Sequence, residues 1–356
     1  MQERVKKLRA LLARSEKPQG LLVRYRPNYF YLSGFSGSTG GLLITQTQAW
    51  LLVDFRYWEQ AEMEATNCKV CRLNSSFWST VAELARDEGL ESLGFEAEHL
   101  SYDDYLNLKN ALGTTEPVAV KGLVEELRQV KNEQELALMQ RAAEIADEAF
   151  RSLIPLIKPG TVELDLALEL EYLMRRAGAE GVPFPLIVAS GPRSALPHGV
   201  ATTRKLRDGD LVVFDFGALY KGYCSDMTRT VIINKAEGWQ REIYFKVLRA
   251  QTKVLAELRE GLHAAEADRF ARDSLQSAGY GPYFGHGLGH GIGIEPHEGP
   301  VLSPRSKALL RQGMVFTVEP GVYLPGRGGV RIEDMVILRE HGPEILTKLI
   351  KKLLIL

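Results

Sequence analysis

The segment VVFDFGALYKGYCSDMTRT, residues 212–230, begins like a core strand and yet contains two aspartates. The apolar residues Val212 to Phe214 lead directly into Asp215, and Asp226 follows in a second segment with apolar neighbours. An ionised carboxylate in an apolar setting is unfavourable unless a partner compensates its charge. The segment therefore raises the question of what these two carboxylates bind.

The same pattern recurs later in the chain. LRDGDLVVFDFG at 206–217 is similar to LRQGMVFTVEPG at 310–321, an offset of 104 positions. With three extra residues allowed after the turn in the second copy, the alignment pairs two acids in each half: Asp215 with Glu319, and Asp226 with Glu333. This repeat predicts two α+β halves related by a pseudo-twofold axis, with four carboxylates facing each other across it.

Two glycine-bounded helical segments repeat in the same way. Gly160 and Gly178 recur 101 positions later as Gly261 and Gly279. The second glycine of each pair is suited to the residue that follows a helix carboxyl end. We therefore predict one such helix in each half.

The first acidic segment is predicted to form a hairpin. With LYKG as a four-residue turn, Asp215 lies directly opposite Asp226, with Cβ atoms roughly 4.5–5.5 Å apart. Two like charges at that distance repel, so one carboxyl is pushed toward protonation. For an isolated pair, one aspartate could face solvent or pair with Arg229. The matching acids in the second half favour a convergent cluster instead.

Four carboxylates at one place need cations. Two divalent ions would neutralise them, and carboxylate bridging suits metals about 3.5–4 Å apart. The segment GHGLGHGIG at 285–293 offers a histidine ligand at His286 or His290. Its many glycines favour extended chain or loop over helix, and they allow the backbone to approach a crowded site closely.

The first third of the chain has the pattern of a small α/β domain. Short apolar runs alternate with helix-like stretches, which is typical of that class. The predicted helices lie near 56–66, 78–89 and 101–111. The chain then becomes charged around 121–132, and this connection is predicted to contain the domain boundary.

A helix is predicted to begin at Asn132, because Glu135 three residues later completes a capping box. Its buried stripe is predicted to contain Leu136, Met139, Ala143, Ala146 and Phe150, which recur at steps of three and four. We place the boundary just before this helix, which gives domains 1–125 and 126–356.

The composition excludes several classes of protein. The 356 residues include 44 Lys+Arg and 45 Asp+Glu, so no charge excess favours nucleic acid or a membrane surface. No apolar stretch is long enough to span a bilayer, and residues 1–20 read as an amphipathic helix instead of a signal peptide. A sparse set of three cysteines fits a reducing, cytoplasmic environment. We interpret Cys68 and Cys71 as inert thiols, not as half a zinc site or a redox pair, and Cys224 is given no role.

The acids and the histidine together resemble a known pattern. In order and context they are similar to the five ligands of the pita-bread metallopeptidases, a family that includes aminopeptidase P, prolidase and methionine aminopeptidase. NYFYLSGFSGSTGGLLIT at 28–45 and DFRYWEQA at 54–61 resemble the creatinase-like amino-terminal domain of aminopeptidase P and prolidase, which methionine aminopeptidases lack. The resemblance spans the whole chain and implies an α+β pita-bread catalytic domain preceded by a smaller α/β domain.

The resemblance implies a dinuclear metal site. Asp226 and Glu333 would bridge two divalent ions, Asp215 would bind one ion, and His290 and Glu319 would bind the other. The oxygen-rich ligand set favours manganese, with cobalt, zinc or iron as alternatives.

It also implies roles for residues around the metals. His198, His286 and His297 lie where the Xaa-Pro enzymes place histidines that bind substrate and stabilise the reaction intermediate. Arg331 corresponds to an arginine that supports the ligands. From the sequence alone, His198 and His297 could equally be surface or capping histidines, and Arg331 could simply pair with Asp334 or another acid.

The predicted reaction is hydrolysis of the bond between an amino-terminal residue and proline. Glu319 would carry a proton from the attacking water to the leaving nitrogen, and His198 and His297 would donate hydrogen bonds to the oxyanion and a neighbouring carbonyl. The motifs favour aminopeptidase P, with a prolidase restricted to dipeptides as the alternative and a non-catalytic binding protein on the same fold as a more remote one. The expected partners are small peptides with proline at the second position and, as in many relatives, a second copy of the chain.

Overall fold

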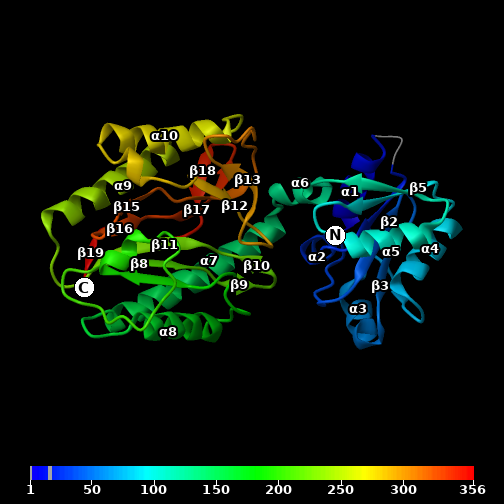
Figure 1. Cartoon of the computed structure of the whole chain (residues 1–356), viewed down its shortest axis with the longest axis horizontal. Helices are drawn as coiled ribbons and strands as arrows, with labels where there is room; N and C mark the ends of the chain where they lie inside the picture. The colour runs from blue at the N-terminus through cyan, green and yellow to red at the C-terminus, as the bar shows by residue number, and fades with distance from the viewer. Residues whose placement is uncertain (1, 15–17) are drawn as a thin grey trace. The chain divides into compact units, whose positions relative to one another are not determined.

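The computed structural model describes residues 2–14 and 18–356, which form two compact units that divide between Arg128 and Gln129 (Figure 1). The predicted boundary between residues 125 and 126 lies inside helix α6 (Leu123–Gln129), and it stays a prediction. Each unit has its own sheet system and its own hydrophobic core.

The amino-terminal unit is built on a six-stranded mixed sheet with the order β4-β3-β2-β1-β5-β6. Strands β1, β2 and β3 form antiparallel pairs, whereas β4, β5 and β6 each run parallel to a neighbour. The strands are β1 (Gly20–Val23), β2 (Gly41–Thr45), β3 (Ala49–Val53), β4 (Lys69–Arg72), β5 (Ser92–Glu96) and β6 (Glu116–Val120). This is the α/β arrangement that the alternating pattern predicts.

The helices of this unit lie close to the predicted ranges. They are α1 (Gln2–Leu12), α3 (Trp58–Glu64), α4 (Phe77–Asp87) and α5 (Tyr102–Leu112). Helix α2 (Arg26–Ser33) was not predicted, because its tyrosine-rich sequence lacks a clear amphipathic period. Its two ends carry readable signals, since Pro27 lies in the first turn and Gly34 ends the helix with a φ of 83°.

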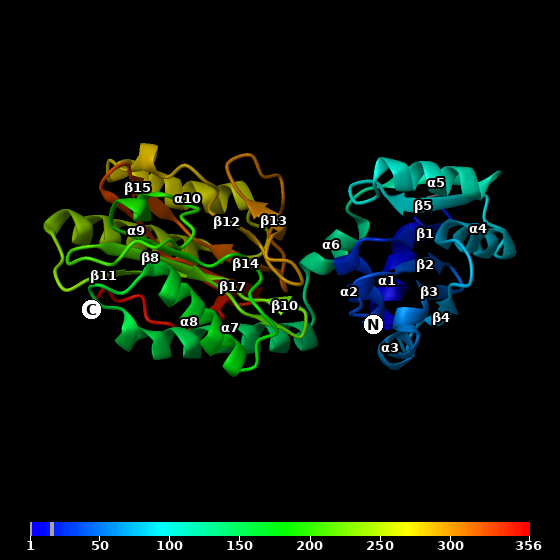
Figure 2. The same ribbon diagram turned by 60° about the horizontal axis from the view of Figure 1, so that its bottom comes forward.

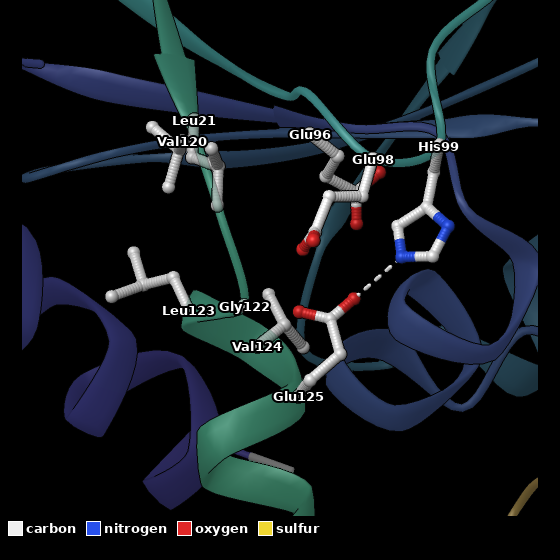
Figure 3. A pocket seen from close by; sticks show the side chains of 9 residues that line it. All are labelled: Leu21, Glu96, Glu98, His99, Val120, Gly122, Leu123, Val124 and Glu125. Atoms are coloured by element: carbon white, nitrogen blue, oxygen red, sulfur yellow. Dashed lines mark hydrogen bonds and ion pairs between the residues drawn. The ribbon is translucent and has the colours of Figure 1, made fainter. Parts of the chain in front are cut away.

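Helix α6 is tied to the end of β5 by a polar cluster that includes Asn28. Figure 3 shows three of its other members, Glu96, His99 and Glu125, with the contact between His99 and Glu125. Glu96 is buried and accepts hydrogen bonds from the backbone of residues 24–25 and from Asn28 Nδ2, at 2.6–2.8 Å. Asn28 Nδ2 also lies 2.6 Å from Glu125 Oε1, which is 2.8 Å from His99 Nε2. We call Asn28, Glu96, His99 and Glu125 the Glu96 cluster; it is held together by donors that the protein itself supplies.

The second unit contains two main sheets, ordered β19-β11-β8-β7 and β13-β12-β14-β17-β18. Their strands are β7 (Ile187–Ser190), β8 (Leu211–Phe216), β11 (Met227–Ile232), β19 (Leu354–Ile355), β12 (Gly289–Gly291), β13 (Glu298–Leu302), β14 (Val315–Val318), β17 (Asp334–Arg339) and β18 (Gly342–Ile345). Helices α7 (Glu133–Leu153) and α8 (Glu163–Arg176) lie on one side of the sheets, and α9 (Gly238–Glu257) and α10 (Ala264–Ser277) lie on the other (Figures 1 and 2).

The order of elements repeats within this unit. Two helices, a short strand and an acid-bearing hairpin form the first half as α7-α8-β7-β8-β11 and the second as α9-α10-β12-β14-β17. The four glycines that bound α8 and α10 all have positive φ, between 78° and 106°, which is costly for residues with a Cβ. The pseudo-twofold repeat that the sequence predicts is confirmed.

The predicted start of α7 is also confirmed. Asn132 caps the helix and forms the full capping box with Glu135. The side chains of the predicted stripe, Leu136, Met139, Ala143, Ala146 and Phe150, are all buried.

The predicted register of the first acidic hairpin is wrong. Asp215 pairs with Thr228 in the β8–β11 ladder, not with Asp226. The tip of the hairpin, β9 (Leu219–Tyr220) with β10 (Tyr223–Cys224), closes through a two-residue turn at Lys221 and Gly222. Both turn residues have positive φ, 46° and 77°, as a type I′ turn requires. Because the true register differs by two residues, the two aspartates still lie on one face of the ladder, diagonal to each other.

The second acidic hairpin is longer. Val318 pairs with Asp334, and the chain between them forms a smaller hairpin of β15 (Gly321–Leu324) and β16 (Gly328–Arg331). Glu319 and Glu333 therefore stand at the junction between the large ladder and the small one, one on each strand.

Candidate metal centre

The structure brings the five predicted ligands together at the meeting of the two halves. Asp215 lies in β8, Asp226 precedes β11, His290 lies in β12, Glu319 follows β14 and Glu333 precedes β17. We call these five residues the metal cluster. The segment around His290 is extended, as its glycines predict.

Distances within the metal cluster fit shared ligation. His290 Nε2 lies 3.3 Å from Glu319 Oε1 and 3.7 Å from Asp226 Oδ2. Asp226, His290 and Glu333 each offer a ligand atom, and these atoms all lie within 4.8 Å of one another. His290 Nδ1 is 3.1 Å from the carbonyl oxygen of Gly291, so it carries the proton and leaves the Nε2 lone pair free for a cation.

The carboxyl groups of the cluster are short of positive partners. Burial, followed by neighbouring carboxylates, raises the pKa of Asp226 and of Glu333 well above their usual values. Burial raises the pKa of Glu319 to about 7, although Arg331 opposes that shift. Within the described part of the chain, Asp226 Oδ1 is buried and has no hydrogen-bond partner. A buried carboxylate oxygen without a donor is what a cation would satisfy, so these residues fit a metal centre.

Each half supplies one threonine that orients a glutamate. Thr228 Oγ1 donates to Glu333 Oε2 at 2.7 Å, and Thr317 Oγ1 donates to Glu319 Oε1 at 3.0 Å. The backbone N–H of His290 in turn donates to Thr317 Oγ1 at 3.1 Å. These contacts fix the side chains that face the cluster.

Arg331 supports the cluster through Asp215. Its guanidinium is buried and donates to Asp215 Oδ2, to Thr228 Oγ1 at 2.9 Å and to Tyr323 OH at 2.8 Å. Of the acids that the sequence leaves open as a partner of Arg331, the structure selects Asp215, whereas Asp334 Oδ1 lies 2.7 Å from Arg229 Nη2. The same ion pair answers the alternative that Arg229 neutralises one of the two aspartates, since its carboxylate partner is Asp334.

The three further histidines lie in different environments. His198 and His297 are exposed, and the His297 ring lies 4.1 Å from the ring of His290. His286 is largely enclosed, and burial followed by the charge of Arg331 lowers its pKa to about 4, so it is neutral. Its Nδ1 is 2.8 Å from the carbonyl of Gly287, and its Nε2 is 3.0 Å from Tyr323 OH. Both ring nitrogens of His286 therefore have partners within the protein.

Tyr323 was missed by the sequence reasoning. It links Arg331 to His286, and burial raises the pKa of its hydroxyl to about 12. The available signal was its position in GVYLPG, in the short connection between two predicted ligands.

The cysteines lie outside this centre. Burial raises the pKa of Cys68 to about 12 and also raises the pKa of Cys71, which disfavours the reactive thiolate in both. Cys224 is buried, and its Sγ lies 3.4 Å from the carbonyl oxygen of Ile294. Of the helices that the structure describes, none combines the length and apolarity needed to cross a membrane.

Two family models match the chain. The model for metallopeptidase family M24 matches residues 137–340, and the model for the creatinase/prolidase N-terminal domain matches residues 4–130. Among individual proteins, the chain is 40% identical over 357 residues to the Xaa-Pro dipeptidase of Pyrococcus horikoshii, covering 99% of both chains. It is also 44% identical over 337 residues to an uncharacterised peptidase of Bacillus subtilis, covering 95% of this chain and 96% of that one.

Solved structures give the same picture. An Xaa-Pro dipeptidase from Bacillus anthracis superposes with a TM-score of 0.97 at 43% identity, covering 99% of both chains. An X-Pro aminopeptidase from Thermotoga maritima superposes with a TM-score of 0.92 at 37% identity, covering 98% of this chain and 100% of that one. Both similarities extend over the two compact units.

Proposed function

The chain belongs to metallopeptidase family M24, and on that premise we propose that it is an Xaa-Pro dipeptidase that uses two divalent metal ions. The observation that carries this proposal is the buried metal cluster, with its excess of carboxylates and an oxygen of Asp226 that has no donor among the residues the structure describes. Two archaeal relatives named Xaa-Pro dipeptidase, at 40% and 41% identity, favour the dipeptidase over the aminopeptidase P that the sequence motifs favour.

The metal cluster would hold the two ions. In this proposal Asp226 and Glu333 would contribute to holding both ions, Asp215 would help to hold one, and His290 with Glu319 would help to hold the other. The oxygen-rich donor set suits manganese, with cobalt, zinc or iron as alternatives. When bound, such a pair of ions makes hydroxide available near neutral pH and polarises the scissile carbonyl.

The protein's own groups would handle the proton and the developing charge. Glu319 would accept a proton from the attacking water and pass it to the leaving proline nitrogen. His198 and His297 would donate hydrogen bonds to the oxyanion and to the neighbouring carbonyl. His286 would bind substrate only if it gave up one of its present partners. In this conformation it would support the site indirectly, through its contact with Tyr323, which in turn binds Arg331.

A comparison of two substrates tests the proposal. Purified protein loaded with manganese is assayed on Ala-Pro and on Ala-Pro-Ala under the same conditions. We expect hydrolysis of the dipeptide with little or no hydrolysis of the tripeptide. Efficient cleavage of Ala-Pro-Ala would support the aminopeptidase, and hydrolysis of neither peptide by the metal-loaded protein would favour a binding protein. A homodimer and a cytoplasmic location stay predictions.

A further inference from the structure

In each half of the second unit, a buried acid of the preceding helix accepts hydrogen bonds from a loop that carries a histidine. Residues 191–202, which we call the His198 loop, lead from β7 past His198. We propose that Glu163, acting with Arg193, is the positioning residue for His198, an inference that rests on the proposed role of His198 in hydrolysis. Neither residue is assigned any role by the resemblance or the motifs.

Glu163 binds both ends of the His198 loop. It is the first residue of α8 and is fully buried. Its Oε1 accepts hydrogen bonds from Ser190 N and Oγ, at 2.8 and 2.6 Å, just before the loop. Its Oε2 accepts from Thr202 N and Oγ1, at 3.0 and 2.7 Å, at the end of the loop. One rigid carboxylate thus fixes where the loop leaves and re-enters the body of the unit.

Arg193 extends this contact toward the histidine. One of its terminal nitrogens pairs with Glu163 Oε2, and the other donates to the carbonyl oxygen of Val200 at 2.7 Å. Val200 N in turn donates to the carbonyl oxygen of His198 at 2.9 Å. The chain of contacts therefore runs from Glu163 to the backbone of His198 in three steps.

The charge on Glu163 is part of this arrangement. Burial alone would raise its pKa, but the hydrogen bonds from Ser190 and Thr202 and the contact with Arg193 lower the pKa below its usual value. Glu163 is therefore ionised at neutral pH, and hydrogen bonds to an ionised acceptor are about twice as strong as neutral ones.

In the second half of the unit, a different acid–arginine pair holds the loop that carries His286. Asp268 of α10 is buried and pairs with Arg272 through two contacts of 2.8 and 2.9 Å. Asp268 Oδ1 also accepts from Leu288 N at 3.0 Å, and Arg272 Nη2 donates to the carbonyl oxygen of His286 at 2.9 Å. A buried acid–arginine pair therefore bonds the backbone of the histidine loop in each half. This recurrence supports a positioning role for Glu163 and Arg193.

The hydrogen-bond partners of Glu163 that carry this argument, Ser190, Arg193 and Thr202, are not members of the metal cluster. The loop also has a contact on the side of the metal cluster, where Arg331 Nη1 donates to the carbonyl oxygen of Pro197 at 3.1 Å, and this contact does not involve Glu163 or Arg193. Loss of the pair should therefore move His198 while Arg331 and the ligands keep their places. If Glu163 had only a general structural role, its loss would disturb metal binding and the position of His198 together.

The first experiment measures the loop without using activity. Hydrogen exchange is followed in peptides covering residues 190–202 for the whole protein and for Glu163→Gln, with Asp165→Asn as control. Asp165 is an exposed acid on the same turn of α8. We expect exchange to become about 10-fold faster in Glu163→Gln and to stay unchanged in the control. Arg193→Met, a change at a partly exposed side chain, provides a second variant if Glu163→Gln folds poorly. Unchanged exchange in both variants would overturn the proposal.

The second experiment is a double-mutant cycle on Ala-Pro hydrolysis. We expect Glu163→Gln to lower kcat/KM by up to about 100-fold, as misplaced catalytic groups do, with an unchanged metal-to-protein ratio. Combined with His198→Ala it should add almost nothing, whereas combined with His286→Ala its effect should add in full. Additive loss with His198→Ala would contradict positioning through that histidine. Faster loop exchange together with full activity of His198→Ala would support the fixation of the loop and refute the catalytic role of His198.

Discussion

The Glu96 cluster and the metal cluster each contain a buried acid, and they differ in how its charge is compensated. In the Glu96 cluster, both oxygens of Glu96 receive hydrogen bonds, two from backbone N–H groups and one from Asn28. In the metal cluster, Asp226 is surrounded by three other carboxylates and keeps one buried oxygen without a donor among the described residues. The first cluster is therefore complete as folded, whereas the second needs cations.

The same difference distinguishes a buried acid with a structural role from one that could bind a metal. Burial raises the pKa of Glu96, but Asn28 and the two backbone donors oppose the shift. Around Asp226 the nearest charges act in the same direction as burial, and Arg331 opposes them more weakly. A buried acid thus indicates a metal site only where the protein fails to supply its donors.

Removal of a carboxylate that we propose to be shared by both ions should have the largest effect on metal binding and turnover. Asp226→Ala or Glu333→Ala should lower metal affinity by more than about 100-fold, because even the outer partners of metal ligands contribute 10–100-fold. Hydrolysis of Ala-Pro should fall to background. Metal analysis and kinetics check this, and an unchanged rate in either variant would refute the metal centre.

Removal of the metal should affect stability in a pH-dependent way. The folded-state pKa of Glu319, about 7, lies above its usual value of 4.5, so in metal-free protein its contribution to stability is lost as pH rises between these values. The bound metal compensates the ionised carboxylates, so the Tm difference between loaded and chelated protein should grow from pH 5 to pH 7.5. A constant difference across this range would contradict the assignment. Hydrogen exchange in the Glu96 cluster should not respond to chelation.

Loss of an orienting hydroxyl should have a smaller effect. Thr228→Val removes the donor to Glu333 and an acceptor for Arg331, so we expect metal affinity to fall about 10-fold in calorimetric titration. Thr230→Val is the matched control, because Thr230 Oγ1 bonds the backbone of Arg331 and no ligand carboxylate. Equal losses in the two variants would mean that orientation of Glu333 contributes little.

The smallest effect is expected in the amino-terminal unit. Glu125→Gln weakens the contacts with Asn28 and His99, both at the partly exposed edge of the Glu96 cluster. We expect a loss of about 1 kcal/mol in stability, a typical value for one hydrogen bond. Metal content and turnover should match the wild type, and a lower metal content would show that the two clusters are coupled.

The sequence predicts the repeat and its four acids because both depend on local pattern, whereas the choice of His290 over His286 comes from the family resemblance. The echo of LRDGDLVVFDFG identifies the two halves, and the glycine positions bound their helices. The register of the first hairpin could have been read from Lys221 and Gly222, but a lysine at positive φ is an uncommon choice for a type I′ turn.

The sequence pattern does not predict which side chains far apart in the chain contact each other. Arg331 and Asp215 lie 116 positions apart, and the sequence offers Asp334 as a nearer partner. Tyr323 joins the site only because the β15–β16 hairpin folds it toward Arg331. The choice between dipeptide and longer substrates depends on pocket walls, which no short motif encodes.

A direct titration tests whether the metal cluster binds two divalent ions. Chelator-treated protein is titrated with manganese in a calorimeter, and the bound metal is then measured by elemental analysis after removal of free ions. We expect two ions per chain, with Ala-Pro hydrolysis restored as the sites fill. Absence of bound metal after reconstitution would contradict the proposed metal centre.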